Sequence, residues 1–146
     1  MRIVFDGPLS IDRETGEMRL RDSNLVFRPN MPLDEFLDSD IYLKTTREWM
    51  NQTSRRFRVH LQKQDESVYL MPTFHEGRLT EIRFAIGKKV EPGGWTRERV
   101  QKDLQLYQEF MIAQVGTTQG TFSWGRSWAA MDEKAGAPTM GIRYEK

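Results

Sequence analysis

The histidines are the first residues to test for chemistry, because imidazole can act as a general base or a metal ligand near neutral pH. The chain of 146 residues has two, His60 and His75. His60 falls on the polar side of an alternating segment, and His75 lies beside Glu76 in a turn-like stretch. Neither has a second nitrogen or carboxylate ligand at metal-site spacing, such as a helical pair four residues apart. The sequence therefore predicts two surface histidines and no metal site.

The patterns of nucleophiles and phosphate-binding loops are also missing. The chain has no cysteine, which removes thiolate catalysis, thiolate metal sites and disulfides together. No Gly-x-Ser-x-Gly elbow occurs, and the adjacent glycines in 92–94 are not followed by the Lys-Ser/Thr of a phosphate loop. We therefore expect a protein that is not an enzyme, without catalytic residues or a cofactor. An enzyme in which His60 and an acid share a deep pocket is the alternative.

Charge is distributed unevenly along a chain whose net charge is only +1. Residues 1–40 hold nine acids and five bases, whereas residues 41–64 hold six bases and one acid. Two groups are candidate surfaces for a charged partner, with plain solvated faces as the alternative. The first, the acidic segment, comprises Asp34, Glu35, Asp38 and Asp40, and the second, the basic strand face, comprises Arg56, Arg58 and His60.

The basic group Arg55, Arg56, Arg58 and Lys63, with Phe57 between them, also raises the question of nucleic acid, because arginines and aromatic rings together bind single strands. Such surfaces carry the rings on the same exposed face as the bases. Phe57 alternates with Arg56 and Arg58, so its ring should point into the core while the guanidinium groups point out. The small net charge supplies no overall field toward nucleic acid. We therefore expect no direct nucleic-acid partner.

Composition indicates one ordered domain covering residues 1–146. Hydrophobic residues make up 38% of the chain, and eight phenylalanines and four tryptophans supply large apolar groups. A domain of this length can bury roughly 68–70% of its unfolded surface around one core. No apolar run approaches the ~18 residues that would span a bilayer. The apolar stretch Ile3–Phe5 is too short for the core of an export signal, so we expect a cytoplasmic protein without a membrane partner.

Hydrophobic periodicity predicts an α+β fold with a mainly antiparallel sheet, one short helix and one long helix, in the order β-β-α-β-β-β-α-β-β. Alternation over 56–62, 68–71 and 81–86 predicts three consecutive strands joined by short polar turns. Thr96 as N-cap and Gly116 as stop bound the long helix. The remaining expected elements are strands at 3–5 and 17–27, a short helix at 33–37, and a closing hairpin within 122–144, while 44–54 is ambiguous.

The closing hairpin carries two of the four tryptophans, Trp124 and Trp128. Residues four apart on a strand share a face, so without a bulge at Gly125 both rings should pack under the long helix. The other interpretation is an exposed binding site, because Arg126 and Trp128 belong to the residue types that dominate interface energetics. Core packing is the favoured expectation.

Two segments resemble a family of small bacterial immunity proteins encoded beside polymorphic or secreted antibacterial toxins. The first runs from Leu25 through Pro29-Asn30-Met31 to Asp34-Glu35-Phe36-Leu37-Asp38-Ser39, and is similar to that family's strand, proline break and acidic helix. The second runs from Phe122-Ser123-Trp124-Gly125 through Asp132-Glu133-Lys134 to Ile142-Arg143-Tyr144, and is similar to its terminal hairpin. The last turn differs, with 134–138 in place of the family's Lys-Gly-Gly.

The resemblance implies a cytoplasmic immunity protein that binds a cognate toxin, occludes its active site and acts in interbacterial competition such as type VI secretion. The acidic segment, Asp34, Glu35, Asp38 and Asp40, is the first candidate contact surface, because it could imitate phosphates in a basic active site. Arg56, Arg58 and His60 are the second. The matched residues are structural types, so the resemblance transfers no contact residue. The alternative is a non-catalytic adaptor of a secretion or phage-derived assembly.

Overall fold

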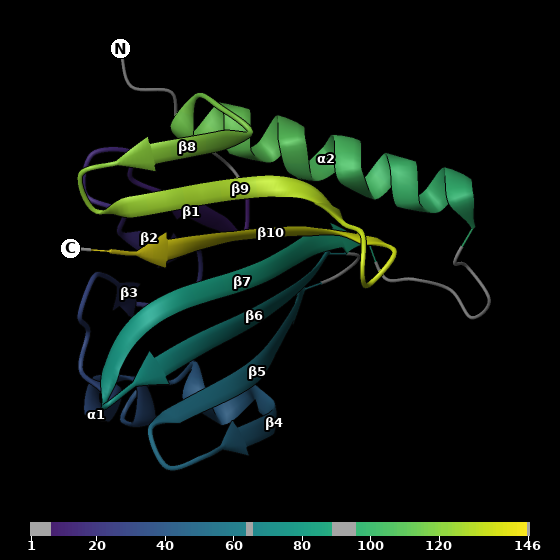
Figure 1. Ribbon diagram of the computed structural model, residues 1–146. Helices are drawn as coiled ribbons and strands as arrows, with labels where there is room; N and C mark the ends of the chain where they lie inside the picture. Colours follow the sequence, from purple (N-terminus) through teal and green to yellow (C-terminus); the bar gives the residue numbers. More distant parts are fainter. Residues whose placement is uncertain (1–6, 64–65, 89–95, 146) are drawn as a thin grey trace.

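The computed structural model describes residues 7–63, 66–88 and 96–145, which form two antiparallel sheets and two α-helices (Figure 1). This is the α+β class expected from the sequence, with one short and one long helix. The elements are β1 Leu9–Ile11, β2 Met18–Leu20, β3 Val26–Phe27, α1 Leu33–Leu37, the 3₁₀ helix η1 Tyr42–Lys44, β4 Thr45–Met50, β5 Ser54–Lys63, β6 Glu66–His75, β7 Arg78–Lys88, α2 Arg97–Val115, β8 Gln119–Phe122, β9 Gly125–Asp132 and β10 Ala137–Tyr144.

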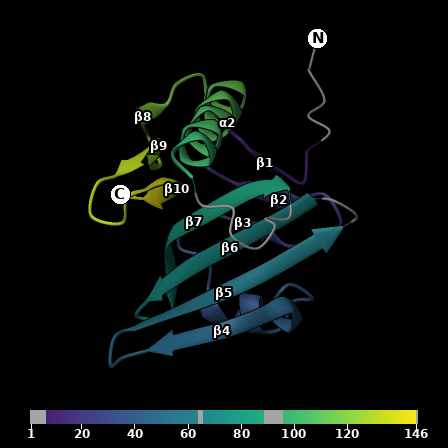
Figure 2. The ribbon, with the colours of Figure 1, turned by 90° about the vertical axis from the view of Figure 1, so that its right-hand side faces the viewer.

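The large sheet has seven strands in the order β4-β5-β6-β7-β10-β9-β8. Strands β5, β6 and β7 form the expected meander, and β9 and β10 form the expected closing hairpin. The two halves of the sheet join where β10 pairs with β7, with Ile142 opposite Ile82. Figure 2 shows the resulting twist, because β5–β7 run across the view while β8–β10 are foreshortened. The small sheet β1-β2-β3 lies behind the large one in Figure 1.

The small sheet, α1 and α2 pack against one face of the large sheet. Under β5 and β6, the Phe36 ring from α1 contacts Phe57 and Phe74, with ring centroids 4.8 and 5.5 Å apart. Further along the sheet, Phe110 of α2 meets Phe84 of β7 edge to face at 5.9 Å. A single cluster of buried side chains connects these regions. The small sheet, α1 and α2 therefore cover the same face.

The helix ends follow the sequence signals. Thr96 caps α2 with its side-chain oxygen, which accepts a hydrogen bond from the Arg99 backbone N–H at 3.1 Å. Gly116 ends the helix in the left-handed conformation, at φ 86°. Tyr107, Phe110 and Met111 are buried against the sheet, as the apolar spacing predicts.

The structure contains elements that the sequence analysis did not predict, among them the strand β1. The ambiguous 44–54 region contains an edge strand, β4, whose side chains are almost all exposed and so lack an apolar alternation. The closing hairpin gains a third strand, β8, beside β9. The extended segment at 17–27 divides into the separate strands β2 and β3. The expected strand at 3–5 and the glycines of 92–94 lie outside the described residues, as does the middle of the expected turn at 63–66.

The expectation that Trp124 and Trp128 share a face is wrong. Trp124 lies in the turn before β9 and is buried, whereas Trp128 is half-buried on the face of the sheet opposite α2. The cause is Gly125, whose φ of 149° breaks the strand alternation between the two rings. Core packing is confirmed for Trp124 alone.

Candidate functional site

The second face of the large sheet carries no helix or strand from the described part of the chain, and we call it the open face. Cross-strand partners point to the same side of a sheet, so the register assigns its residues. Arg56 pairs with Trp49 and Thr73, and Gly141 pairs with both Arg83 and Trp128. Away from the β6–β7 turn, where His75 and Arg78 also take outward positions, the charged and aromatic residues of this face are Arg47, Trp49, Arg56, Arg58, His60, Tyr69, Glu81, Arg83, Arg126, Trp128, Asp132 and Arg143, with Glu145 just beyond β10.

The basic strand face forms part of this open face, as the alternation predicts. Phe57 is fully buried, and its neighbours Arg56 and Arg58 are exposed. His60 is half-buried, with its imidazole stacked on Tyr69 at 4.3 Å and its Nε2 2.7 Å from the Ser67 hydroxyl. The structure therefore brings the three residues of the second candidate surface together, and adds an aromatic ring that sequence reasoning missed.

Each aromatic ring of the open face lies beside an arginine. The guanidinium carbon of Arg47 lies 4.7 Å from the Trp49 ring, and that of Arg58 lies 4.7 Å from Tyr69. Arg83 lies 5.9 Å from Trp128. Guanidinium groups are attracted to the negative face of such rings, which also restricts the long arginine side chain. No sequence signal could pair Arg58 with Tyr69, because their strands meet only in the folded sheet.

Gly141 shapes the β10 side of the open face. It lies between Arg83 and Trp128 in the register, and an added Cβ would come within 2.6 Å of the indole ring. Because Gly141 has no side chain, the Trp128 ring can lie across the β10 backbone at this position. Beside it is a hollow of about 550 Å³, whose charged lining residues are Glu81, Arg83, Arg126 and Arg143.

Charge on the open face is mainly positive. Three arginines have acidic neighbours, because Glu81 pairs with Arg83 at 3.2 Å and Glu145 lies 3.4 Å from Arg126 and 3.8 Å from Arg143. Within the described ranges, the other three, Arg47, Arg56 and Arg58, make no ion pair. They contact instead a ring or, for Arg56, the Thr73 hydroxyl at 3.2 Å. These three guanidinium groups remain available for an anion from outside.

The acidic segment lies on the other side of the β5–β7 region, on and just after α1. All four carboxylates are exposed. Glu35 forms two hydrogen bonds with Arg28, at 2.6 and 2.7 Å, and this contact lowers the pKa of Glu35. Asp40 accepts a hydrogen bond from the Ser23 hydroxyl at 2.8 Å. Asp34 and Asp38 are therefore the two members of this surface without a side-chain partner in the described chain.

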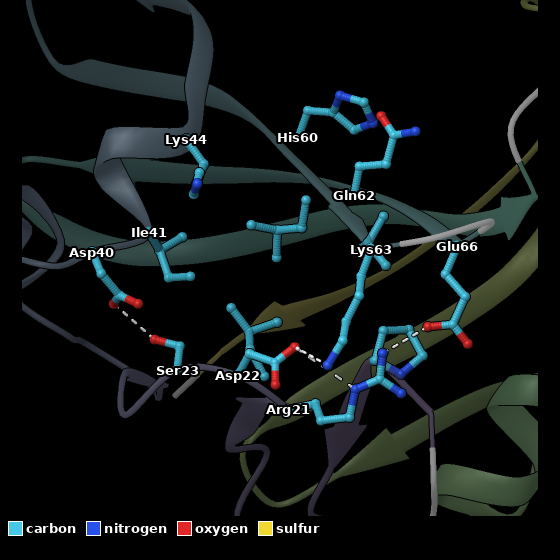
Figure 3. A pocket seen from close by; sticks show the side chains of 14 residues that line it. Arg21, Asp22, Ser23, Asp40, Ile41, Lys44, His60, Gln62, Lys63 and Glu66 are labelled. Carbon is cyan, nitrogen blue, oxygen red and sulfur yellow. Dashed lines mark hydrogen bonds and ion pairs between the residues drawn. The ribbon is translucent and has the colours of Figure 1, made fainter.

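A pocket of about 350 Å³ opens between the small sheet, η1 and the ends of β5 and β6 (Figure 3). Charged pairs close its rim: Arg21 to Glu66 at 2.7 Å and Lys63 to Asp22 at 3.4 Å. His60 lines its edge, but its side chain points away from these carboxylates in Figure 3. The pocket therefore provides no pairing of histidine with an acid. Its walls include Leu20, Ile41, Leu61 and Val68.

The described residues were compared with the patterns of a metal site and of a membrane-spanning helix. Among them, no group of three or more His, Asp or Glu side chains could hold a metal ion. No helix in the described ranges combines the length and the apolar character needed to cross a bilayer.

Comparison with known proteins identifies a similar fold. No protein-family model and no curated protein matches the chain. A solved structure described as "Rhs1-CT in complex with cognate immunity protein RhsI1" contains a chain of similar fold. The TM-score is 0.57 at 17% sequence identity, and the alignment covers 94% of this chain and 87% of that chain. The arrangement of sheet and helices is thus shared with a chain of an immunity complex over nearly its whole length.

Proposed function

We propose that this protein is an immunity protein, which binds a cognate antibacterial toxin and neutralises it by occluding its active site. The observation that carries the proposal is the fold shared with a chain of the Rhs1-CT–RhsI1 complex over 94% of the present sequence. The resemblance of the 25–39 segment and the terminal hairpin to immunity proteins supports it from the sequence side. Binding is stoichiometric and needs no cofactor, because occlusion requires only a complementary surface.

Co-expression with the toxin encoded beside this gene tests the proposal. The wild-type chain should restore growth to cells that make the active toxin, and should copurify with a toxin inactivated in its active site. The inactive toxin separates binding from survival, and this chain expressed alone should leave growth unchanged. Absence of both rescue and copurification would overturn the proposal. Copurification with a structural component, without protection from any toxin, would indicate an adaptor instead.

The cellular setting is a further part of the proposal. We place the protein in the cytoplasm of the producing cell, where it meets toxin that arrives through a type VI secretion system. A recipient lacking this gene should lose in competition with an attacker that secretes the toxin, and should recover when the attacker's secretion system is deleted. Killing that persists without that system would exclude this route but leave neutralisation intact. Fractionation of recipient cells checks the location.

Two surfaces are available for the toxin contact. The acidic segment offers Asp34 and Asp38 as free carboxylates, which suit a toxin whose active site binds anions. The open face offers Arg56, Arg58 and His60 together with the aromatic rings beside them. The two lie on opposite sides of the sheet, so charge reversals on each can be compared within one folded protein.

A further inference from the structure

We infer that the open face is the partner-binding surface of this protein, and that it binds an acidic protein surface. This inference rests on the proposed function and specifies which side of the molecule meets the toxin. Three arginines of the open face lie beside aromatic rings of the same face, in the Arg47–Trp49, Arg58–Tyr69 and Arg83–Trp128 pairs.

The chemistry of these pairs suits a protein interface. Arginine, tryptophan and tyrosine are the residues that most often dominate the binding energy of protein interfaces. An arginine held against a ring has already lost part of its side-chain freedom, so less entropy is lost when a carboxylate binds its free edge. A guanidinium can take such a carboxylate through two parallel hydrogen bonds. The stacked arginines are thus arranged in advance for an acidic partner.

The charge of the open face is complementary to an acidic partner. Away from the β6–β7 turn, the open face carries six arginines but only three acidic residues, Glu81, Glu145 and Asp132. The Asp132 carboxylate already accepts hydrogen bonds from backbone N–H groups of its own turn. Positive charge is concentrated over β4 and β5, where Arg47, Arg56 and Arg58 have no acidic partner among the described residues. An excess of unneutralised guanidinium groups within one Debye length of each other favours a partner of opposite charge.

The surroundings of the Tyr69 ring favour a protein partner over a single-stranded nucleic acid. A single-stranded nucleic acid needs free ring faces on which its bases stack. Here Tyr69 is stacked on His60 and approached by Arg58, so its ring already has neighbours that a base would have to displace. Carboxylates of a protein, in contrast, can approach the exposed edges of the guanidinium groups without unstacking them.

The experiment measures the affinity of charge-reversal variants for one probe, the active-site-inactivated toxin encoded beside this gene. The test variant is Arg56→Glu/Arg58→Glu, and the matched control is Arg97→Glu/Lys102→Glu, which makes the same charge change at exposed positions of α2. We expect Kd from calorimetry to rise at least ~10-fold for the test variant, in the range for interfacial charges. The control should stay within about threefold, as expected for exposed charges outside an interface.

Two further measurements make the result specific. The salt dependence of Kd between low and moderate NaCl should be flatter for the test variant, because fewer charge pairs form. Hydrogen exchange on the complex should show added protection in β5 and β6. Trp128→Ala, on the second half of the face, should also weaken binding. Thermal unfolding of each variant confirms that it is folded before its affinity is interpreted.

The outcomes separate this inference from the proposed function. If the wild-type chain does not bind the toxin, the proposed function fails and the inference fails with it. If the wild type binds and Arg56→Glu/Arg58→Glu binds equally well, only the inference is overturned. A selective loss with Asp34→Lys/Asp38→Lys would assign the contact to the acidic segment. Tight binding of a labelled single-stranded oligonucleotide, lost in the arginine variant while toxin binding persists, would reassign the face to nucleic acid.

Discussion

Gly125 decides on which side of the sheet each hairpin tryptophan lies. Its φ of 149° is poorly accessible to residues with a Cβ, and an added Cβ would lie 1.9 Å from the Arg143 carbonyl oxygen. Trp124 consequently turns into the core, where its indole N–H donates to the Arg13 carbonyl at 2.8 Å. Trp128 is left to the open face. A single backbone angle thus separates a structural tryptophan from a candidate binding one.

Substitution of Gly125 by alanine should therefore destabilise the fold strongly. The backbone must leave its conformation and the Arg143 carbonyl must move, which together cost about 2–5 kcal/mol. The matched control is Gly136→Ala, where φ is 66° but an added Cβ would meet open space. The control should cost only about 1–2 kcal/mol. Urea unfolding measures both, and equal losses would contradict the steric account.

Two buried phenols link stability to alkaline pH. Burial, with a smaller contribution from Glu17, raises the pKa of Tyr144 far above its usual value, and its hydroxyl donates to the Gly16 carbonyl at 2.6 Å. Burial, with Asp103 adding to it and Arg99 opposing it, raises the pKa of Tyr107 to about 12. Above pH ~10 the unfolded chain releases these protons while the folded chain keeps them. The contribution of these two phenols to the free energy of unfolding is therefore fully present below pH ~10 and is lost as the pH rises above it.

Tyr144→Phe tests this linkage. At neutral pH the variant should lose about 1–3 kcal/mol, because the buried Gly16 carbonyl loses its donor. Between pH ~10 and pH ~11.5 the free energy of unfolding should fall less steeply than in the wild type, by up to about 1.4 kcal/mol per pH unit. Urea unfolding across this range measures the difference. Parallel slopes would mean that Tyr144 does not carry the effect.

At the scale of elements, a few polar contacts add to the buried apolar packing that holds the small sheet against the rest of the fold. The turn between β1 and β2 packs on the Trp124 ring, since an added Cβ on Gly16 would lie 2.5 Å from it. The Ile11 N–H donates to the Gln114 side-chain oxygen of α2 at 2.8 Å. Together with the Arg13 and Gly16 carbonyls, these contacts connect the N-terminal strands to α2, β9 and β10.

Trp124→Phe should loosen this attachment. The variant loses the indole donor to Arg13, so we expect a loss of about 1–2 kcal/mol in stability. Amide exchange should rise in β1 and β2 more than in β5 and β6, because local opening follows the weakened contact. Trp49→Phe on the exposed edge strand is the control, with an expected change within about 0.5 kcal/mol. Uniform exchange increases across both sheets would contradict a local role.

At the scale of the whole molecule, the β7–β10 pairing joins two halves of one sheet. Its register contains the pairs Gly141–Arg83, Ile142–Ile82 and Arg143–Glu81, a shorter ladder than that between β6 and β7. The junction is supported from the covered face, where Ile82 and Ile142 are fully buried and α2 reaches Phe84 through Phe110. The same junction extends the open face from Arg56 to Arg143.

Residues 1–146 should accordingly unfold as one cooperative domain. Because one buried cluster runs beneath both halves, neither half can lose its packing alone. Tryptophan fluorescence, far-ultraviolet circular dichroism and calorimetry should report a single coincident transition. Two transitions, with β8–β10 and α2 separating from β4–β7, would show that the β7–β10 junction is a domain boundary.

The sequence by itself determined the features that depend on local periodicity and local chemistry. Alternation along 56–62 predicts a buried Phe57 between exposed Arg56 and Arg58, and the structure confirms this. Thr96 and Gly116 fix the ends of α2, because caps act within one helical turn. The resemblance to immunity proteins also came from the sequence, through residues of structural type.

The tertiary structure decided which side chains from distant segments meet. It placed β10 between β7 and β9, brought Tyr69 beside Arg58 and His60, and used the dihedral angle of Gly125 to separate the tryptophans. Alternation states only that a side chain lies on one face or the other, whereas strand order and register depend on long-range packing. For this reason the basic strand face could be predicted, but the open face to which it belongs required the folded sheet.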